Sequence, residues 1–170
     1  MVSTRALLIC VLLGSSLLTL TSCQSVQFYQ QAIAGQTKLL WQRQDTSKLL
    51  SSDVIEPALR QRLESVAELL SFADSEGLAS HGAYSSYVET GQSYVIWNVF
   101  AARPYALELK TSCFPIAGCV SYRGYFHESA AREYAEFLER QDYEVYVGGV
   151  VAYSTLGWFE DPLLDTFLFR

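Results

Sequence analysis

Histidine is scarce in this sequence, because the 170 residues contain only His81 and His127. A zinc site with two imidazole ligands would need both, and nothing in the sequence brings them together. The nearest approach to a metal-binding H-E-x-x-H helix is His127-Glu128, but Ala131 stands where the second histidine belongs. We interpret Glu128 as an acidic residue in the first turn of a helix and His81 as a solvated loop residue. The sequence therefore predicts no metal ligand and no catalytic residue in this chain.

Basic residues are also few and dispersed. Twelve Lys and Arg against 18 Asp and Glu give a formal net charge of −6, with no basic cluster. A nucleic-acid partner is excluded on this ground, since binding to phosphates needs a basic surface patch. A G-x-S-x-G nucleophile elbow and a phosphate-binding glycine loop are absent as well, which removes the sequence signals for those two classes of enzyme.

The sequence also lacks an apolar run long enough to span a membrane comfortably, which takes about 20 residues. The apolar stretch 6–20 follows Arg5 and ends in Leu20-Thr21-Ser22-Cys23, the order of parts in a bacterial secretory signal. These last four residues resemble the lipobox of bacterial lipoproteins. We therefore expect a signal peptide over 1–22, a mature chain over 23–170 and a lipid on the Cys23 thiol; a signal anchor is the alternative.

The predicted lipid would make the membrane a partner of this protein. Gln24, which follows Cys23, resembles the sorting signals that favour the outer membrane. The expected location is therefore the cell envelope, on the periplasmic face of that membrane. Several acyl chains hold a protein on a bilayer far better than one, because each buried methylene adds ~0.8 kcal/mol.

Cysteine is limited to four residues. Cys10 would be lost with the signal peptide and Cys23 would carry lipid, which leaves Cys113 and Cys119. In an oxidising compartment two thiols this close in sequence usually pair, so we predict a disulfide. A metal site is the alternative, but it would need further ligands at a suitable spacing nearby.

Half of the residues are apolar, which predicts a packed core. The predicted fold class is α+β, with an N-terminal helical hairpin followed by a small mixed sheet and one crossover helix. Helical spacing of apolar residues predicts helices over 25–44, 57–77 and 128–141, and a loop separates the second from the sheet over 78–92. Strand patterns cover 94–100, 106–109, 120–126 and 143–152, the last with a bulge at Gly148-Gly149.

Turn-forming residues follow the last strand, and Leu163, Leu164, Phe167 and Leu168 then begin another helix. The sequence ends about two turns into it, and a helix that short is marginal by itself. We therefore expect that this element continues outside the 170 residues.

Three stretches resemble a known family. Cys113–Phe126, Val147–Pro162 and Asn98 within WNVFAA are similar to hallmarks of the predicted aminopeptidases of bacterial envelopes, which are zincin-type lipoproteins. The resemblance implies a partial zincin-like domain and a zinc-dependent peptidase that removes residues from the amino end of peptides. In that family the H-E-x-x-H helix lies downstream of the Gly-Trp-Phe segment, beyond the last residue here. Zinc is thus expected for the full-length family, and we expect this chain alone to hydrolyse nothing.

Zincins hold an extended peptide against an edge strand, and 143–152 is the candidate strand. Gly148 and Gly149 would let a substrate backbone approach closely, while Tyr153 could donate to a developing oxyanion. Alternatively, the glycines mark the bulge and Tyr153 is a packed aromatic. The hypothesis for function is the N-terminal portion of a zinc aminopeptidase with a peptide substrate; the alternative is a non-catalytic envelope lipoprotein that binds or supports other molecules.

Overall fold

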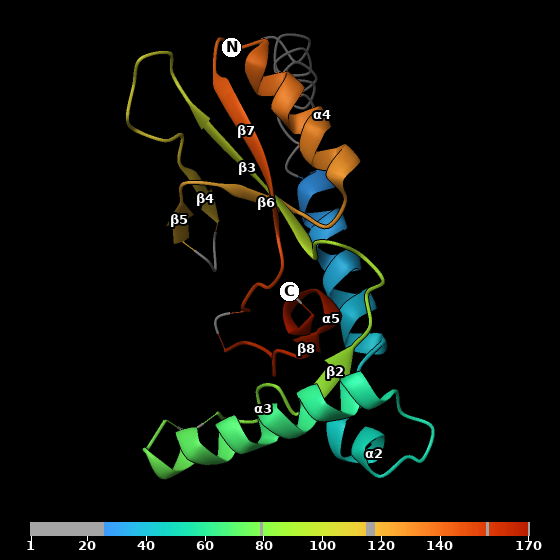
Figure 1. The fold of residues 1–170 in the computed structure, drawn as a ribbon. Coiled ribbons are helices and arrows are strands. Elements are labelled where there is room, and N and C mark those ends of the chain that lie inside the picture. Colours follow the sequence, from blue (N-terminus) through green and yellow to red (C-terminus); the bar gives the residue numbers. More distant parts are fainter. Residues whose placement is uncertain (1–25, 79, 115–117, 156, 170) are drawn as a thin grey trace, which may run out of the picture.

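The structure is a computed structural model that describes residues 26–78, 80–114, 118–155 and 157–169 (Figure 1). The predicted signal peptide and the predicted lipid on Cys23 lie outside these residues. The fold class is α+β, as predicted. A helix over 26–41 is followed by α2 Thr46–Leu50, α3 Pro57–Ser75, α4 Glu128–Glu139 and α5 Asp165–Leu168. The strands are β1 Gln44–Asp45, β2 Ser86–Val88, β3 Ile96–Ala102, β4 Ser112–Phe114, β5 Gly118–Val120, β6 Arg123–Tyr125, β7 Glu144–Val150 and β8 Leu163–Leu164.

The main sheet has the strand order β6-β3-β7, with β3 in the middle. Both neighbours pair with β3 in the antiparallel sense, so β6 and β7 run parallel to each other. The helix α4 connects them across one face, which confirms the predicted crossover (Figure 1). Mixed pairing occurs in the smaller sheet β1-β2-β8 instead, where β1 is antiparallel and β8 parallel to β2.

The helix α4 packs through the apolar stripe that its sequence predicts. Its buried residues are Ala131, Tyr134, Ala135 and Leu138, and they form one cluster with Val99, Ala101 and Tyr125 of the sheet. On the outer side of α4, Nη2 of Arg132 lies 2.5 Å from Oε1 of Glu128, one turn away. The spacing of apolar residues at the helical period of 3.6 residues thus determines which side of α4 faces the sheet.

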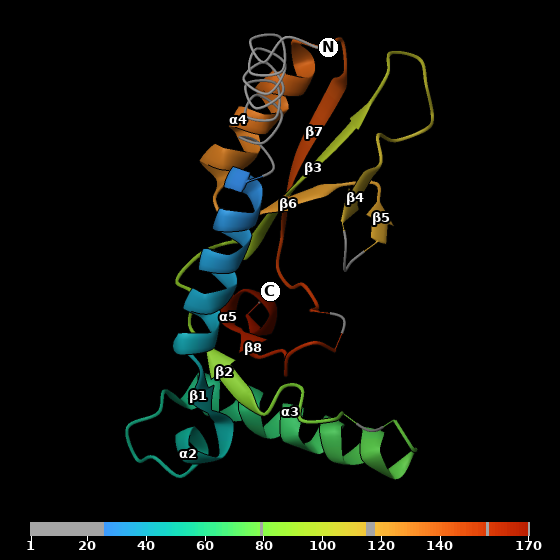
Figure 2. The same cartoon turned by 180° about the vertical axis from the view of Figure 1, so that it is seen from behind.

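The helix 26–41 and α3, which we expected to pair as a hairpin, do not lie side by side. Figures 1 and 2 show α3 lying across the lower end of the helix 26–41, rather than along it. Leu39 of the first helix packs in one cluster with Val88 and Leu164, while Leu63 of α3 packs in another with Tyr87 and Leu163. The reason is that β1 and α2 stand between the helices, and β1 pairs with β2.

One edge of the main sheet is closed by a side chain. Gln31 of the helix 26–41 donates from Nε2 to the Gly124 carbonyl at 3.3 Å, and its Oε1 accepts from the Phe126 N–H at 3.0 Å. The amide of Gln31 therefore takes the place of a neighbouring strand beside β6. β7 is the opposite edge of this sheet.

The predicted bulge at Gly148-Gly149 is wrong. The pairing of β7 with β3 runs without a break, with Gly148 opposite Asn98 and Gly149 opposite Trp97. Gly149 is needed in this strand for another reason. A Cβ on Gly149 would lie 2.3 Å from Cγ of the Tyr94 ring, which covers this part of the strand.

Three further expectations need correction. The segment 106–109 is no strand, because only Leu109 forms an isolated bridge, to Ala102. The expected loop 78–92 contains β2, and the expected helix at 163 starts as β8, which pairs with β2, before α5 begins at Asp165. Backbone hydrogen bonds to distant strands decided both cases, and local periodicity does not report them. Among the described residues, no helix is both long and apolar enough to cross a membrane.

Candidate functional site: an apolar cleft on the sheet

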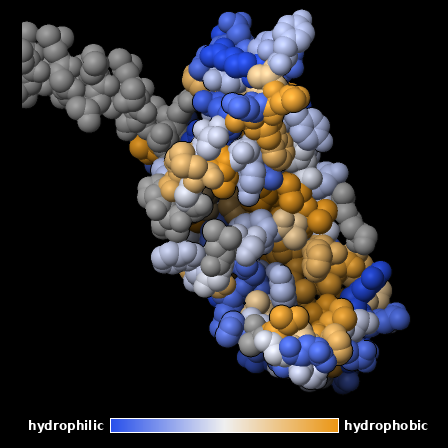
Figure 3. All heavy atoms as spheres, turned by 90° about the vertical axis from the view of Figure 1, so that its left-hand side faces the viewer, coloured by the Kyte–Doolittle hydropathy of each residue, from blue (hydrophilic) through white to orange (hydrophobic). Residues whose placement is uncertain are grey.

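A cleft of about 700 Å³ opens on the face of the main sheet that α4 does not cover. Side chains alternate along a strand, so Ile96, Asn98 and Val150 face the cleft while Val99 and Val147 face α4. Figure 3 shows the side of the molecule that carries the β4–β5 hairpin, with hydrophobic surface gathered along its middle. We call this feature the sheet cleft; it is lined by Phe28, Tyr29, Ala32, Ile96, Asn98, Phe114, Val120, Tyr122, Gly124, Val150, Ala152, Tyr153, Ser154, Thr155 and Trp158.

The floor of the sheet cleft contains one polar atom without a partner. The Oδ1 atom of Asn98 is buried and accepts no hydrogen bond from the part of the chain that the structure describes. Gly124 stands beside it on β6, and a Cβ there would lie 3.1 Å from this oxygen. The glycine thus keeps the space in front of Asn98 open. A buried acceptor left unpaired costs about 1–3 kcal/mol, which a ligand that donates an N–H would recover.

The β4–β5 hairpin forms one wall of the cleft. Cys113 and Cys119 lie opposite each other in this hairpin and form a disulfide, which confirms the predicted pairing. Phe114 and Val120 line the cleft from these two strands. The ring of Phe114 also stacks on Phe28 at 5.2 Å between centroids, which connects this wall to the helix 26–41.

The segment after β7 forms the opposite wall, and Asp161 holds it in place. The carboxylate of Asp161 accepts hydrogen bonds from Thr155 Oγ1 at 2.6 Å and from the Thr155 N–H at 3.1 Å. Trp158 follows in this loop, is 67% exposed and lines the cleft. A large aromatic side chain is thus available to a ligand at the opening.

Tyr153 lies at the junction of this segment and the helix 26–41. Its hydroxyl donates to Oε1 of Gln36, and its ring meets Phe126 edge to face at 5.7 Å. Burial raises the pKa of Tyr153 well above its usual range, and the charge of Asp161 adds to this. This is the environment expected of the packed aromatic in our alternative interpretation, and the oxyanion role stays a prediction.

Gly148 and Gly149 lie on the edge strand β7, close to the end that leads to the cleft. Their pairing partners on β3 are Asn98 and Trp97, and Asn98 is the floor residue described above. The structure therefore brings the strand of the two glycines and Tyr153 to one end of the sheet. Their predicted part in substrate binding stays a prediction.

The described residues do not fit a zinc ion. Within 26–78, 80–114, 118–155 and 157–169, no three His, Cys, Asp or Glu side chains come together in a way that could hold a metal. His127 is exposed at the N-terminal end of α4, and the neighbouring Glu128 binds Arg132 instead of a metal. His81 is exposed in a loop.

The helix 26–41 contributes to the cleft in a way that the sequence did not predict. Phe28, Tyr29 and Ala32 lie against the open side of the sheet, more than 60 residues before β3. The only signal was that apolar residues occupy more than one stripe of this helix. That pattern indicates two buried surfaces, but it does not tell which element lies across from each.

The segments that carried the resemblance meet at the sheet cleft. Asn98, the hairpin and strand 113–126, and the segment 152–158 supply most of the lining residues. No curated protein and no solved structure matches the chain. Residues 27–170 do match a family model, and its description is "Putative aminopeptidase". The match spans nearly all of the described residues, and the chain therefore belongs to this aminopeptidase family.

Proposed function

We propose that this chain is the peptide-binding part of a zinc-dependent aminopeptidase that a lipid on Cys23 holds at the cell envelope. The observation that supports the proposal best is the sheet cleft, because the family's hallmark segments surround it at the end of an edge strand. An open apolar cleft beside a strand edge that pairs with no other described strand suits an extended peptide with an apolar side chain.

The edge of β7 is the surface along which the peptide would add. The edge of β6 already makes hydrogen bonds to Gln31, so main-chain pairing is left to the outer side of β7. Peptides that add to an edge gain affinity from main-chain hydrogen bonds and specificity from the pockets that receive their side chains. On β7 the nearest such pocket is the sheet cleft, which Val150 lines.

Asn98 would fix the orientation of the peptide. Its Oδ1 is the buried acceptor on an otherwise largely apolar floor, and an N–H of the ligand would satisfy it. A ligand that fills the cleft without donating a hydrogen bond would leave this oxygen unpaired. We therefore expect the sheet cleft to select ligands by their N–H donor as well as by the apolar surface that they bury.

A zinc ion would need ligands other than the described residues, because no three suitable side chains come together among them. What the described residues supply is binding and orientation. The second candidate function is a non-catalytic envelope lipoprotein that keeps the cleft for binding, which the largely apolar lining of the cleft supports as well.

Trp158 provides the test of peptide binding. We expect the peptide Leu-Ala-Ala to change the tryptophan emission of the purified chain in a saturable way, and Ser-Ala-Ala to bind more weakly. The reason is the apolar lining around Trp158. Replacing Asn98 by the similarly sized Leu should weaken binding about fivefold, since one neutral hydrogen bond contributes roughly 1 kcal/mol.

Trp41 supplies the matched control, because it is 85% exposed and does not line the cleft. Trp41→Phe should keep the emission change, and Trp158→Phe should remove it. Equal binding of both peptides would refute the cleft proposal. In the same samples we expect no hydrolysis of aminoacyl chromogenic substrates; turnover that a zinc chelator stops would show that the 170 residues are a complete enzyme.

The lipid anchor is tested separately. Labelled palmitate should be incorporated when the chain is expressed in a Gram-negative host, and the product should sediment with the outer membrane. Cys23→Ser should abolish the label because the acceptor thiol is gone. Cys10→Ser, which changes the other cysteine of the N-terminal region, should leave it intact. A label that survives in Cys23→Ser would disprove the anchor.

A further inference from the structure

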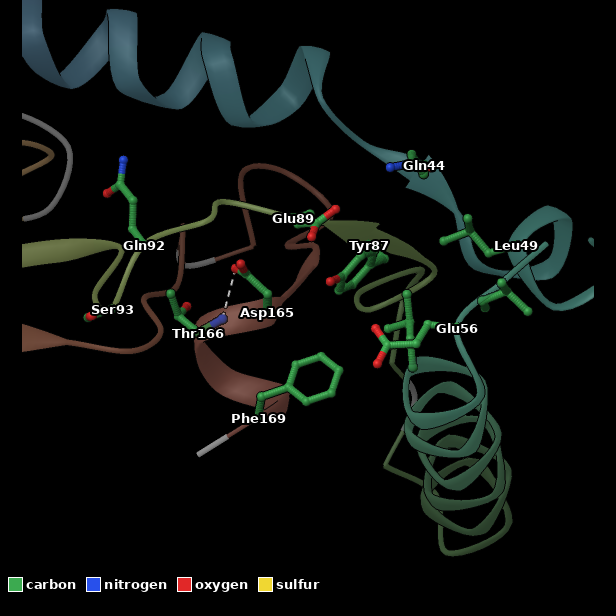
Figure 4. A pocket seen from close by; sticks show the side chains of 12 residues that line it. Gln44, Leu49, Glu56, Tyr87, Glu89, Gln92, Ser93, Asp165, Thr166 and Phe169 are labelled. Carbon is green, nitrogen blue, oxygen red and sulfur yellow. Dashed lines mark hydrogen bonds between the residues drawn. The ribbon is translucent and has the colours of Figure 1, made fainter.

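A second cavity, of about 650 Å³, shares no lining residue with the sheet cleft, and no motif of the sequence pointed to it (Figure 4). It opens between α2, the start of α3, the strand β2 and the C-terminal α5. We call it the acidic cavity; it is lined by Gln44, Leu49, Ile55, Glu56, Leu59, Tyr87, Glu89, Gln92, Ser93, Asp165, Thr166 and Phe169.

Tyr87 is a buried residue of this cavity whose side chain carries a hydroxyl. The residue is only 3% exposed, and its ring packs with Leu63, Leu163 and Leu168. Its hydroxyl reaches the cavity, as Figure 4 shows, whereas the ring is buried. The buried ring holds the hydroxyl at the cavity surface, where it is available to a ligand that offers a polar group.

Three carboxylates surround this hydroxyl. Burial, together with the negative charges of Asp165, Glu89 and Glu56, raises the pKa of Tyr87 to about 12. The hydroxyl therefore stays protonated at neutral pH. The negative charge of the cavity comes from the three carboxylates. The three acidic residues come from segments more than 30 residues apart, and only the fold brings them around one point.

The negative charge has no basic side chain to balance it in the described part. Asp165 accepts from Thr90 Oγ1 at 2.6 Å and from the Gly91 N–H at 2.9 Å, and these are neutral donors. Glu56 and Glu89 form no ion pair with a described residue. Arg60, on the first turns of α3, donates instead to the carbonyls of Leu50 and Ser52 at 2.6 and 2.7 Å.

The spacing of the acidic groups decides between kinds of cation. No three carboxylates among the described residues converge closely enough to hold a metal ion. An organic ammonium group needs no such convergence, because its charge interacts over several ångströms and its N–H groups spread over separate acceptors. The remaining wall is apolar and includes Leu49, Ile55, Leu59 and Phe169, which suits a ligand with an apolar body.

We propose that the acidic cavity binds an organic ammonium ion with an apolar body, with its charge among Glu56, Glu89 and Asp165 and its apolar part against Phe169. The Tyr87 hydroxyl lies beside the charged group and completes the polar side of the site. This proposal concerns a site separate from the sheet cleft, and it does not depend on peptidase activity.

Calorimetric titration of the full chain with phenethylammonium chloride tests the proposal. We expect saturable binding that weakens at least tenfold with 2-phenylethanol, which has nearly the same shape without the charge. Binding should also weaken as the salt concentration rises, because exposed charges are screened. The double variant Glu56→Gln and Glu89→Gln should reduce affinity at least tenfold, and Tyr87→Phe should reduce it severalfold while keeping the ring.

Two exposed glutamates on α3 supply the matched control. Glu64 and Glu68 lie outside the cavity lining, so the double variant Glu64→Gln and Glu68→Gln removes the same charge elsewhere and should leave affinity unchanged. Equal affinity for the alcohol and the ammonium ion would overturn the proposal. So would equal loss in both double variants, since the effect would then come from net charge alone.

Discussion

Leu138→Ala is expected to lower the free energy of unfolding by about 3.5 kcal/mol, the middle of the range for truncating a buried leucine. Leu138 is 2% exposed and lies on the inner side of α4, in the cluster that joins this helix to the main sheet. Its neighbours Val99 and Ala135 belong to rigid elements, so the space left by the lost methyl groups closes only partly.

Urea denaturation followed by circular dichroism measures this loss. Leu69→Ala is the matched control, because it makes the same change on α3 at a side chain that is 65% exposed. We expect a change within about 0.5 kcal/mol there, as for most surface substitutions. If Leu138→Ala were no more destabilising than Leu69→Ala, α4 would not be packed on the sheet in the way described.

Gly149→Ala is expected to destabilise the protein by about 2 kcal/mol, although alanine favours strands slightly more than glycine does. The added Cβ would lie 2.3, 2.4 and 2.6 Å from three ring atoms of Tyr94, far inside normal contact. The Tyr94 ring also packs on Trp97 at 5.1 Å between centroids, so it can shift only by disturbing a second ring.

The neighbouring glycine is the control for this prediction. A Cβ on Gly148 would meet only the outer end of the Tyr146 side chain, at 2.9 Å, and Tyr146 is 68% exposed and free to turn away. Gly148→Ala should therefore be nearly neutral in thermal unfolding. The double variant Gly149→Ala with Tyr94→Leu should recover part of the lost stability; an equal loss with and without the Tyr94 ring would contradict the steric explanation.

The control variant Gly148→Ala also tests the predicted approach of a peptide to β7. Gly148→Ala is expected to leave stability unchanged, so a change in its affinity for Leu-Ala-Ala reports contact with the ligand. Unaltered affinity would remove Gly148 from the proposed substrate-side wall, while leaving the sheet cleft in place.

Local sequence patterns predicted the elements whose burial is fixed by their own periodicity. The helix α4, the strands β3 and β7 and the crossover between β6 and β7 appear close to the predicted positions. The disulfide between Cys113 and Cys119 was also predictable, since few cysteines were left to pair. In each case the signal lies within about a dozen residues of chain.

Contacts between distant segments were decided by the tertiary structure alone. The two glycines at 148–149 suggested a bulge, but Gly149 is required by the ring of Tyr94, which no local pattern reveals. Arg123 is held over the ring of Phe28 at 4.1 Å, which brings together residues almost 100 positions apart. The sheet cleft and the acidic cavity are likewise made of side chains from several elements.

The sequence by itself thus determined the composition of the core, the main helices and strands, the disulfide and the resemblance to the aminopeptidase family. Only the tertiary structure decided that the helix 26–41 closes the β6 edge through Gln31, which leaves β7 as the open edge beside the cleft. The physical reason is that periodicity specifies which side of an element is buried, whereas the partner on that side depends on the packing of the whole chain.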